Sequence, residues 1–132
     1  MGSEMCIRDR LYTEAFLAGN KNHAIKSISH ITGGGLIENP PRAFNSNLSI
    51  KFDMKNYKIP PIFKWLQSKA NISLFELAKT FNCGIGLLIF VNKKDKETVM
   101  TNLNEAGYDA FIIGRMIENI SNRSVLFDGW EL

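Results

Sequence analysis

The 132-residue sequence lacks most of the features that mark a secreted, membrane-bound or metal-binding protein. It has two cysteines, Cys6 and Cys83, and no Cys, His or acidic residues at the spacing of a metal site. It also lacks a secretory signal and any apolar run of the roughly 18 residues that a membrane helix needs. We therefore expect a reduced, cytoplasmic protein with no disulfide, no metal site and no membrane contact.

The sequence also lacks a large excess of positive or negative charge. Lys and Arg number 16 against 13 Asp and Glu, a net charge of +3. The densest basic run, residues 93–97, is interrupted by two acids, which is typical of the solvated start of a helix. Nucleic-acid-binding proteins usually concentrate Lys and Arg in a stripe. We therefore expect no nucleic-acid partner, and the weak positive excess suits an anionic small molecule.

The amino-acid composition predicts one folded domain. Hydrophobic residues make up 45% of the chain and charged residues 22%, as in an ordinary globular protein. This length allows a substantial core, but not a two-domain nucleotide-dependent enzyme. Residues 1–10 show no periodicity and resemble a non-native leader or translated flanking DNA, the alternative being a short native arm. We expect residues 11–132 to form the domain.

Helical and strand patterns alternate along the chain and predict an α/β (α+β) fold with a mixed sheet packed against helices. Strand patterns cover residues 24–31, 48–53, 83–91, 108–117 and 124–127. The nearly continuous apolar run of 83–91 predicts a central strand covered on both faces. Helical patterns cover residues 11–21, a short segment after the glycines at 33–35, a segment opening at Pro60-Pro61, 74–79 after Ser73, and 96–105 between Asp95 and Gly107.

The strongest chemical signal is the sequence His-Ile-Thr-Gly-Gly-Gly-Leu, which begins at His30. Three glycines between a strand and a helix leave backbone N–H groups that an anion can approach closely, with the helix dipole behind them. Thr32, Gly33, Gly34 and Gly35 are therefore candidate phosphate or substrate ligands. The segment lacks the Gly-Lys-Ser/Thr of a Walker A loop, and a plain tight turn could have the same sequence.

Polar side chains near the glycines are further candidates. His30 could donate to a substrate oxygen or move a proton, because imidazole titrates near neutral pH, or it could hydrogen-bond the loop backbone. Glu38 and Asn39 could face the same cleft or satisfy helix-end groups. Arg42 could pair with a phosphate or be a surface cation. Cys83, among apolar neighbours, is predicted to be a buried, unreactive thiol.

Three blocks in this order resemble the C-terminal domain of the phosphoribosylformylglycinamidine cyclo-ligases, also called aminoimidazole ribonucleotide synthetases. They are residues 30–42, from His-Ile-Thr-Gly-Gly-Gly-Leu-Ile-Glu-Asn to Pro-Pro-Arg, then residues 60–67 and 80–86. The likeness continues to about Glu118. Pro40 departs from the pattern, because the family usually has an aliphatic residue there, so the helix after the glycines is expected to start or bend differently.

The resemblance implies that the chain is the C-terminal portion of an ATP-dependent ligase of purine biosynthesis, inactive alone. In that reaction ATP phosphorylates the formyl oxygen of formylglycinamidine ribonucleotide, an amidine nitrogen attacks the carbon, and loss of phosphate leaves aminoimidazole ribonucleotide. The resemblance also implies a homodimer and a separate N-terminal domain that binds most of the ATP and Mg²⁺. In this picture Thr32 to Gly35 hold a phosphate or the substrate, and His30 polarises or positions it.

Two alternatives stay open on the sequence alone. The chain could be a free-standing module of the same domain type, either non-catalytic or dependent on a partner. It could also come from a relative with the same two-domain architecture, such as formylglycinamidine ribonucleotide synthetase, selenophosphate synthetase or thiamine-monophosphate kinase. Residues 65–67 and 82–83 favour the cyclo-ligase.

Overall fold

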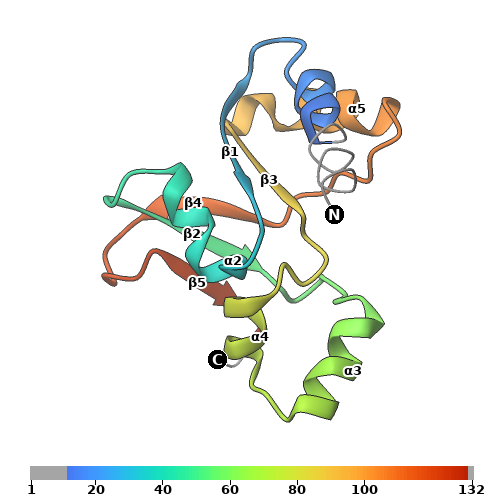
Figure 1. The fold of residues 1–132 in the computed structure, drawn as a ribbon. Coiled ribbons are helices and arrows are strands. Elements are labelled where there is room, and N and C mark those ends of the chain that lie inside the picture. The colour runs from blue at the N-terminus through green and yellow to red at the C-terminus, as the bar shows by residue number, and fades with distance from the viewer. Residues whose placement is uncertain (1–11, 131–132) are drawn as a thin grey trace. The chain divides into compact units, whose positions relative to one another are not determined.

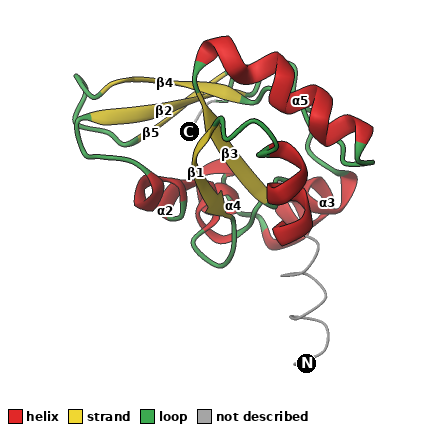
Figure 2. Cartoon of the chain, turned by 90° about the horizontal axis from the view of Figure 1, so that it is seen from above, coloured by secondary structure: helices red, strands yellow, loops and turns green. Residues whose placement is uncertain are grey.

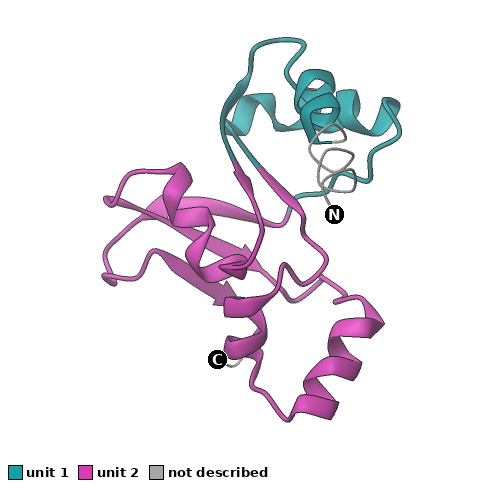
Figure 3. Ribbon diagram, in the orientation of Figure 1, with its two compact units in different colours: residues 1–28, 89–112 teal, residues 29–88, 113–132 magenta. Residues whose placement is uncertain are grey.

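The computed structural model describes residues 12–130, which form two compact units. Unit 1 comprises the residues up to 28 together with 89–112, and unit 2 comprises 29–88 together with the residues from 113 on (Figure 3). Strands β1 (Ile25–His30) and β3 (Leu87–Val91) pair in a two-stranded sheet, and each runs from one unit into the other. The leader predicted at residues 1–10 lies outside the described residues and stays a prediction.

Unit 1 is built around the helix of residues 12–19 and α5 (Lys96–Glu105), which the 3-10 helix η2 (Lys93–Asp95) precedes. The bounds of α5 confirm the helix predicted between Asp95 and Gly107. A small core of buried side chains holds the unit together, consisting of Ala15, Ala24, Val99 and Leu103. Partly buried apolar side chains surround it, namely Ile25, Ile89, Val91, Tyr108 and Ala110.

The end of α5 is closed by two hydrogen bonds around a glycine. Gly107 N–H donates to the Asn104 carbonyl and Tyr108 N–H to the Leu103 carbonyl, each at 3.0 Å, which is the pattern of a Schellman motif. Gly107 has a φ of +91°, which glycine adopts at no steric cost. The predicted role of Gly107 as the residue after the helix is therefore confirmed.

The strand predicted over 108–117 is wrong in its first half, because β4 comprises only Gly114–Glu118. The amides that would begin such a strand are used at the end of α5. Tyr108 N–H donates to the last turn of the helix, and Ala110 N–H donates to Oδ1 of Asn104 at 3.1 Å. A strand pattern in the sequence cannot form a ladder when its donors are already occupied.

Unit 2 contains a three-stranded mixed sheet with β2 (Leu48–Asp53) at its centre (Figures 1 and 2). β2 pairs antiparallel with β4 and parallel with β5 (Val125–Asp128). Phe52 of β2 is fully buried, and its ring stacks on that of Phe127 with centroids 5.2 Å apart. The mixed sheet together with the helices confirms the predicted fold class.

The predicted central strand over 83–91 is wrong in its start and in its coverage. β3 begins at Leu87, and within it only Leu88 is buried, the other four residues being partly exposed. Its one pairing partner among the described residues is β1. The central, doubly paired strand of the sheet in unit 2 is β2 instead.

The residues before β3 form a tight turn. Ile85 N–H donates to the Asn82 carbonyl at 2.9 Å, and the two residues between them, Cys83 and Gly84, have φ values of +53° and +91°. These are the φ signs of a type I′ turn, and extended strands require negative φ. Cys83 and Ile85 are nevertheless buried, so the apolar run reflects a buried turn followed by a half-buried strand.

The helices of unit 2 begin where local signals predict. α3 (Pro61–Ala70) opens on proline, and α4 (Leu74–Thr80) follows Ser73, whose side chain accepts from Glu76 N–H at 3.2 Å. Two short helices follow β1, namely α2 (Gly35–Glu38), which packs against α4, and the 3-10 helix η1 (Pro40–Ala43). In the described part of the chain no helix is long and apolar enough to cross a membrane.

Replacing Gly107 by alanine should lower the free energy of unfolding by about 1 kcal/mol. A Cβ at Gly107 meets open space, so the left-handed φ is the only added cost. Gly33→Ala is the matched control, because Gly33 is equally open and has no left-handed φ; it should change stability by at most about 0.5 kcal/mol. Urea unfolding followed by circular dichroism measures both, and equal losses would contradict the assignment.

Candidate functional site

The glycine segment, residues 32–35, links β1 to α2 and forms a tight turn in unit 2. Gly35 N–H donates to the Thr32 carbonyl at 2.9 Å, and Thr32 N–H donates to Oδ1 of Asn39 at 2.7 Å. The two outer amides of the segment are therefore satisfied internally. The amides of Gly33 and Gly34 have no acceptor among residues 12–130, which makes them the donors that a ligand could use.

The three glycines differ in the space around them. Gly35 has a φ of +59°, and a Cβ there would overlap the carbonyl oxygen of Ala78 in α4 and lie 2.8 Å from that of Phe81. A Cβ on Gly34 would lie 2.8 Å from Nδ2 of Asn39. A Cβ on Gly33 would have no heavy atom within 4 Å. Packing thus explains Gly35, whereas nothing in the described structure requires a glycine at position 33.

The other predicted site residues lie close to this turn in sequence. His30 is the exposed last residue of β1, and Glu38 is the exposed last residue of α2. Asn39 is only 5% exposed, and its carbonyl accepts from the N–H of exposed Arg42 at 3.2 Å. The structure therefore joins Thr32, the three glycines and Asn39 through hydrogen bonds and close packing, with the backbone of Arg42 attached to them.

The helix behind the glycines is too short to supply the dipole expected from the sequence. α2 has four residues and no side-chain cap at Gly34. Pro40 lacks an N–H, so the α-helical ladder cannot continue, and the chain goes on as η1. The α-helix therefore ends at Glu38, and the difference in start or bend expected from Pro40 stays a prediction. Any attraction for an anion at this segment must come from individual amides.

The second glycine motif, residues 80–86, supports the first. Gly86 carbonyl accepts from Ile31 N–H at 2.9 Å, immediately before the glycine segment, and Phe81 supplies a carbonyl that borders Gly35. Gly84 fits beneath Pro60 and Tyr57, whose Cγ and Oη would lie 2.6 and 2.7 Å from a Cβ there. Gly84 therefore lies in close contact with two side chains, in a turn instead of the strand predicted there.

Tyr57 is a contributor that the sequence analysis missed. Its hydroxyl donates to the Cys83 carbonyl at 2.7 Å and so anchors the turn before β3. Burial, and to a smaller extent the neighbouring Cys83, raise the pKa of the Tyr57 hydroxyl, which keeps it a neutral donor. The pairing of a tyrosine with a backbone 26 residues away leaves no mark in the sequence.

Cys83 is a structural thiol. Its Sγ is buried 3.9 Å from the Leu77 carbonyl and 3.8 Å from the Phe81 carbonyl, and burial raises the pKa of the thiol to about 11. The thiolate, which is the reactive form, is therefore suppressed. The predicted burial of the thiol is confirmed, and its low reactivity stays a prediction.

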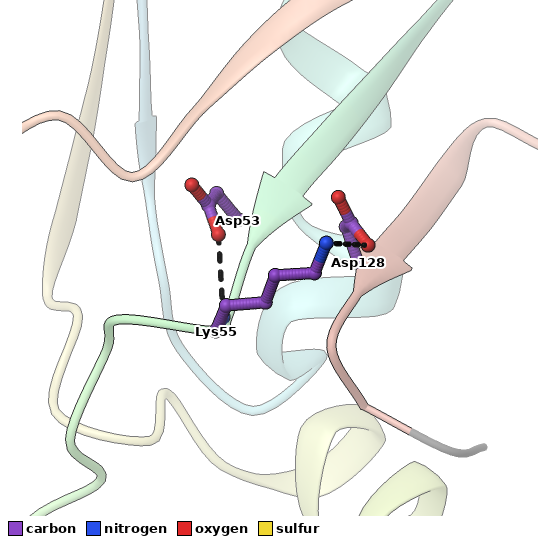
Figure 4. Close-up of polar contacts among 3 residues, drawn as sticks. All are labelled: Asp53, Lys55 and Asp128. Carbon is purple, nitrogen blue, oxygen red and sulfur yellow. Dashed lines mark hydrogen bonds and ion pairs between the residues drawn. The ribbon is translucent and has the colours of Figure 1, made fainter.

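A charged contact at the end of the mixed sheet lies apart from the glycine segment. Nζ of Lys55 is 3.3 Å from Asp128, and Lys55 N–H donates to the Asp53 carboxylate at 3.2 Å (Figure 4). The two aspartates are partners in the β2–β5 register, so the lysine offsets their repulsion. The Lys55 and Asp128 side chains are 63% and 41% exposed, and such pairs contribute little stability.

The chain is similar to known proteins over most of its length. The family described as AIR synthase related protein, C-terminal domain, matches residues 4–125. The chain is 39% identical to the phosphoribosylformylglycinamidine cyclo-ligase of Alkaliphilus oremlandii over 118 residues, which are 89% of this chain and 35% of that protein.

Fused purine biosynthetic proteins also match. The bifunctional protein of Pichia angusta is 39% identical over 89% of this chain and 15% of its own length. The trifunctional protein adenosine-3 of Homo sapiens is 33% identical over 89% of this chain and 12% of its own length. The chain thus spans about a third or less of each of these relatives.

Gly35→Ala should lower the free energy of unfolding by at least about 3 kcal/mol, because overlap with the α4 backbone adds to the cost of the left-handed φ. Urea unfolding measures the loss, with Gly33→Ala as the near-neutral comparison. A Gly35→Ala protein of normal stability would show that the close approach to α4 is not required.

Alkylation of Cys83 should be slow in the folded chain. At pH 8 a thiol of pKa about 11 has roughly a hundredfold less thiolate than one of pKa 9, and burial slows the reaction further. The reaction should accelerate as pH rises towards 11. Mass spectrometry of the Cys83 peptide after iodoacetamide treatment, with and without urea, measures this, and equal rates in both would refute the burial.

Proposed function

Because the chain belongs to the C-terminal domain family of the AIR synthase related proteins, we propose that it is the C-terminal portion of a phosphoribosylformylglycinamidine cyclo-ligase. The 39% identity to the cyclo-ligase of Alkaliphilus oremlandii supports this assignment. The reaction is the ATP-dependent closure of formylglycinamidine ribonucleotide to aminoimidazole ribonucleotide. The chain works with the N-terminal domain of the same enzyme, in a cytoplasmic homodimer.

The observation that best supports a role for this chain is that the Gly33 and Gly34 amides have no acceptor among residues 12–130. Gly33 is exposed and Gly34 is half-buried, and nothing comes within 4 Å of a Cβ built on Gly33. A phosphate oxygen can therefore approach the backbone at Gly33 without a steric barrier. Donors that are fixed before charge develops stabilise that charge in the transition state. This suits a reaction that makes and expels a phosphate.

The remaining predicted residues take supporting roles in this proposal. Thr32 and Gly35 form the turn, because their amides are engaged within the chain. Arg42 supplies a positive charge to the phosphate, and His30 polarises or positions the substrate. Glu38 borders Gly34 and adds the only carboxylate of the group.

Magnesium and most contacts to ATP are assigned to the N-terminal domain. In the described part of this chain, no three His, Cys, Asp or Glu side chains gather closely enough to hold a metal ion. The described residues therefore do not fit a metal site. We assign to this chain the binding and orienting of anionic groups.

One surface supports the need for a further domain. None of the ten residues of α3 is fully buried, and Ile62 and Trp65, three positions apart, are 60% and 56% exposed. Residues at this spacing share a helix face. Exposed apolar surface of this kind is typical of a region that another protein segment covers.

The proposed function is tested by adding the N-terminal domain encoded in the same genome and assaying formation of aminoimidazole ribonucleotide. We expect neither part to be active alone and the mixture to turn over. A folded mixture, or an intact source protein, without activity would overturn the proposal and favour a non-catalytic module.

In the active protein, Gly34→Val should lower kcat/KM at least about tenfold, through a higher KM or loss of turnover. The new side chain would displace Asn39 or cover the neighbouring amides. Gly107→Ala, in unit 1, is the control and should keep the kinetics of the unmodified protein. Normal kinetics of Gly34→Val would show that the glycine segment has no part in the reaction.

A further inference from the structure

Asn39 is one of three polar residues that are buried in the described structure, together with Ser29 and Ser49. We propose that Asn39 is a positioning residue, which holds the glycine segment in the conformation that leaves the Gly33 and Gly34 amides available to an anion. The binding of an anion here rests on the function proposed above. The hydrogen bonds of Asn39 are observed independently of that function.

Asn39 is bonded to the chain on both sides of the segment. Its Oδ1 accepts from Thr32 N–H at 2.7 Å, before the glycines, and its carbonyl accepts from Arg42 N–H at 3.2 Å, after α2. Its own N–H donates to the Gly35 carbonyl at 3.4 Å. One residue therefore fixes the start of the turn, the end of α2 and the backbone of the nearby cation.

The Thr32–Asn39 bond does more than satisfy a donor. Thr32 is an exposed residue, yet its N–H is bound to a carboxamide that the chain buries, in a partly buried hydrogen bond. Thr32 N–H is bound to Asn39 and Gly35 N–H is bound to Thr32, so two of the four amides in the segment cannot donate to a ligand. The two between them are left as an adjacent pair of donors.

The neutrality of the side chain is the second part of the inference. Aspartate has nearly the size of asparagine and could accept the same bond from Thr32. It would also place a negative charge beside amides that receive an anion, and like charges repel more strongly where water is excluded. Leucine has a similar size but accepts no bond. These two replacements separate the hydrogen bond from the charge.

The test uses the full 132-residue chain, labelled with ¹⁵N and titrated with inorganic phosphate. In the unmodified chain, the Thr32 amide should exchange slowly with solvent, and phosphate should shift the Gly33 and Gly34 amide resonances. Asn39→Leu should abolish the protection of Thr32 and raise the phosphate Kd at least about fivefold. Asn39→Asp should retain the protection of Thr32 and still raise the Kd at least about fivefold.

Asn20→Leu is the matched control. Oδ1 of Asn20 accepts from Ile25 N–H at 3.1 Å, so this change breaks the same kind of bond in unit 1. It should leave the phosphate Kd within about twofold of the original. Asn39→Asp keeps the test decisive if Asn39→Leu does not fold.

Two outcomes overturn the proposal. One is an Asn39→Asp or Asn39→Leu chain that binds phosphate as the unmodified chain does. The other is an unmodified chain whose glycine amides do not respond to phosphate. An inactive mixture in the cyclo-ligase assay is a separate result and overturns the proposed function instead.

Discussion

Gly35 passes so close to the carbonyl oxygens of Ala78 and Phe81 that no side chain fits between them, and the glycine segment depends on this contact. α4 is held in turn by Leu77 and Ala78, both fully buried. The chain after α4 folds into the turn that Tyr57 anchors, and then returns to β1 through the Gly86–Ile31 bond. Two glycine motifs that are distant in sequence therefore form one structure, in which the second motif supports the first.

This arrangement divides the glycines by the reason for their presence. Substitution at Gly35 acts first on stability, because its surroundings are backbone atoms that cannot move aside. Gly33 has open space around it and a φ outside the left-handed region, so an alanine is sterically acceptable there. A requirement for glycine at position 33 would therefore come from what approaches the turn and not from the fold. Loss of activity on substitution of Gly35 would reflect lost stability, whereas loss of activity on substitution of Gly33 would reflect a blocked approach to the turn.

The sequence predicts the elements that carry local signals. Ser73 caps α4 and Gly107 follows α5 as predicted, whereas the cap predicted from Asp95 is wrong, because its side chain makes no capping hydrogen bond at the start of α5. The strand predicted over 83–91 is wrong at its start because hydrophobicity indicates burial and not conformation, and the turn at Cys83 and Gly84 is as apolar as a buried strand. The glycines and the family likeness predict the candidate site. The bond from Thr32 to Asn39 could not be predicted, since it depends on how the intervening turn folds.

Under the proposed function, the chemistry of this segment also bears on how it would bind a phosphate. Gly33 and Gly34 offer neutral amide donors, Arg42 is the nearby cation, and Glu38 places a carboxylate beside Gly34. The neutral, buried Asn39 fits this arrangement, because a second carboxylate at that position would oppose the anion. The segment is therefore suited to an anion whose binding depends on oriented backbone donors more than on an excess of positive charge.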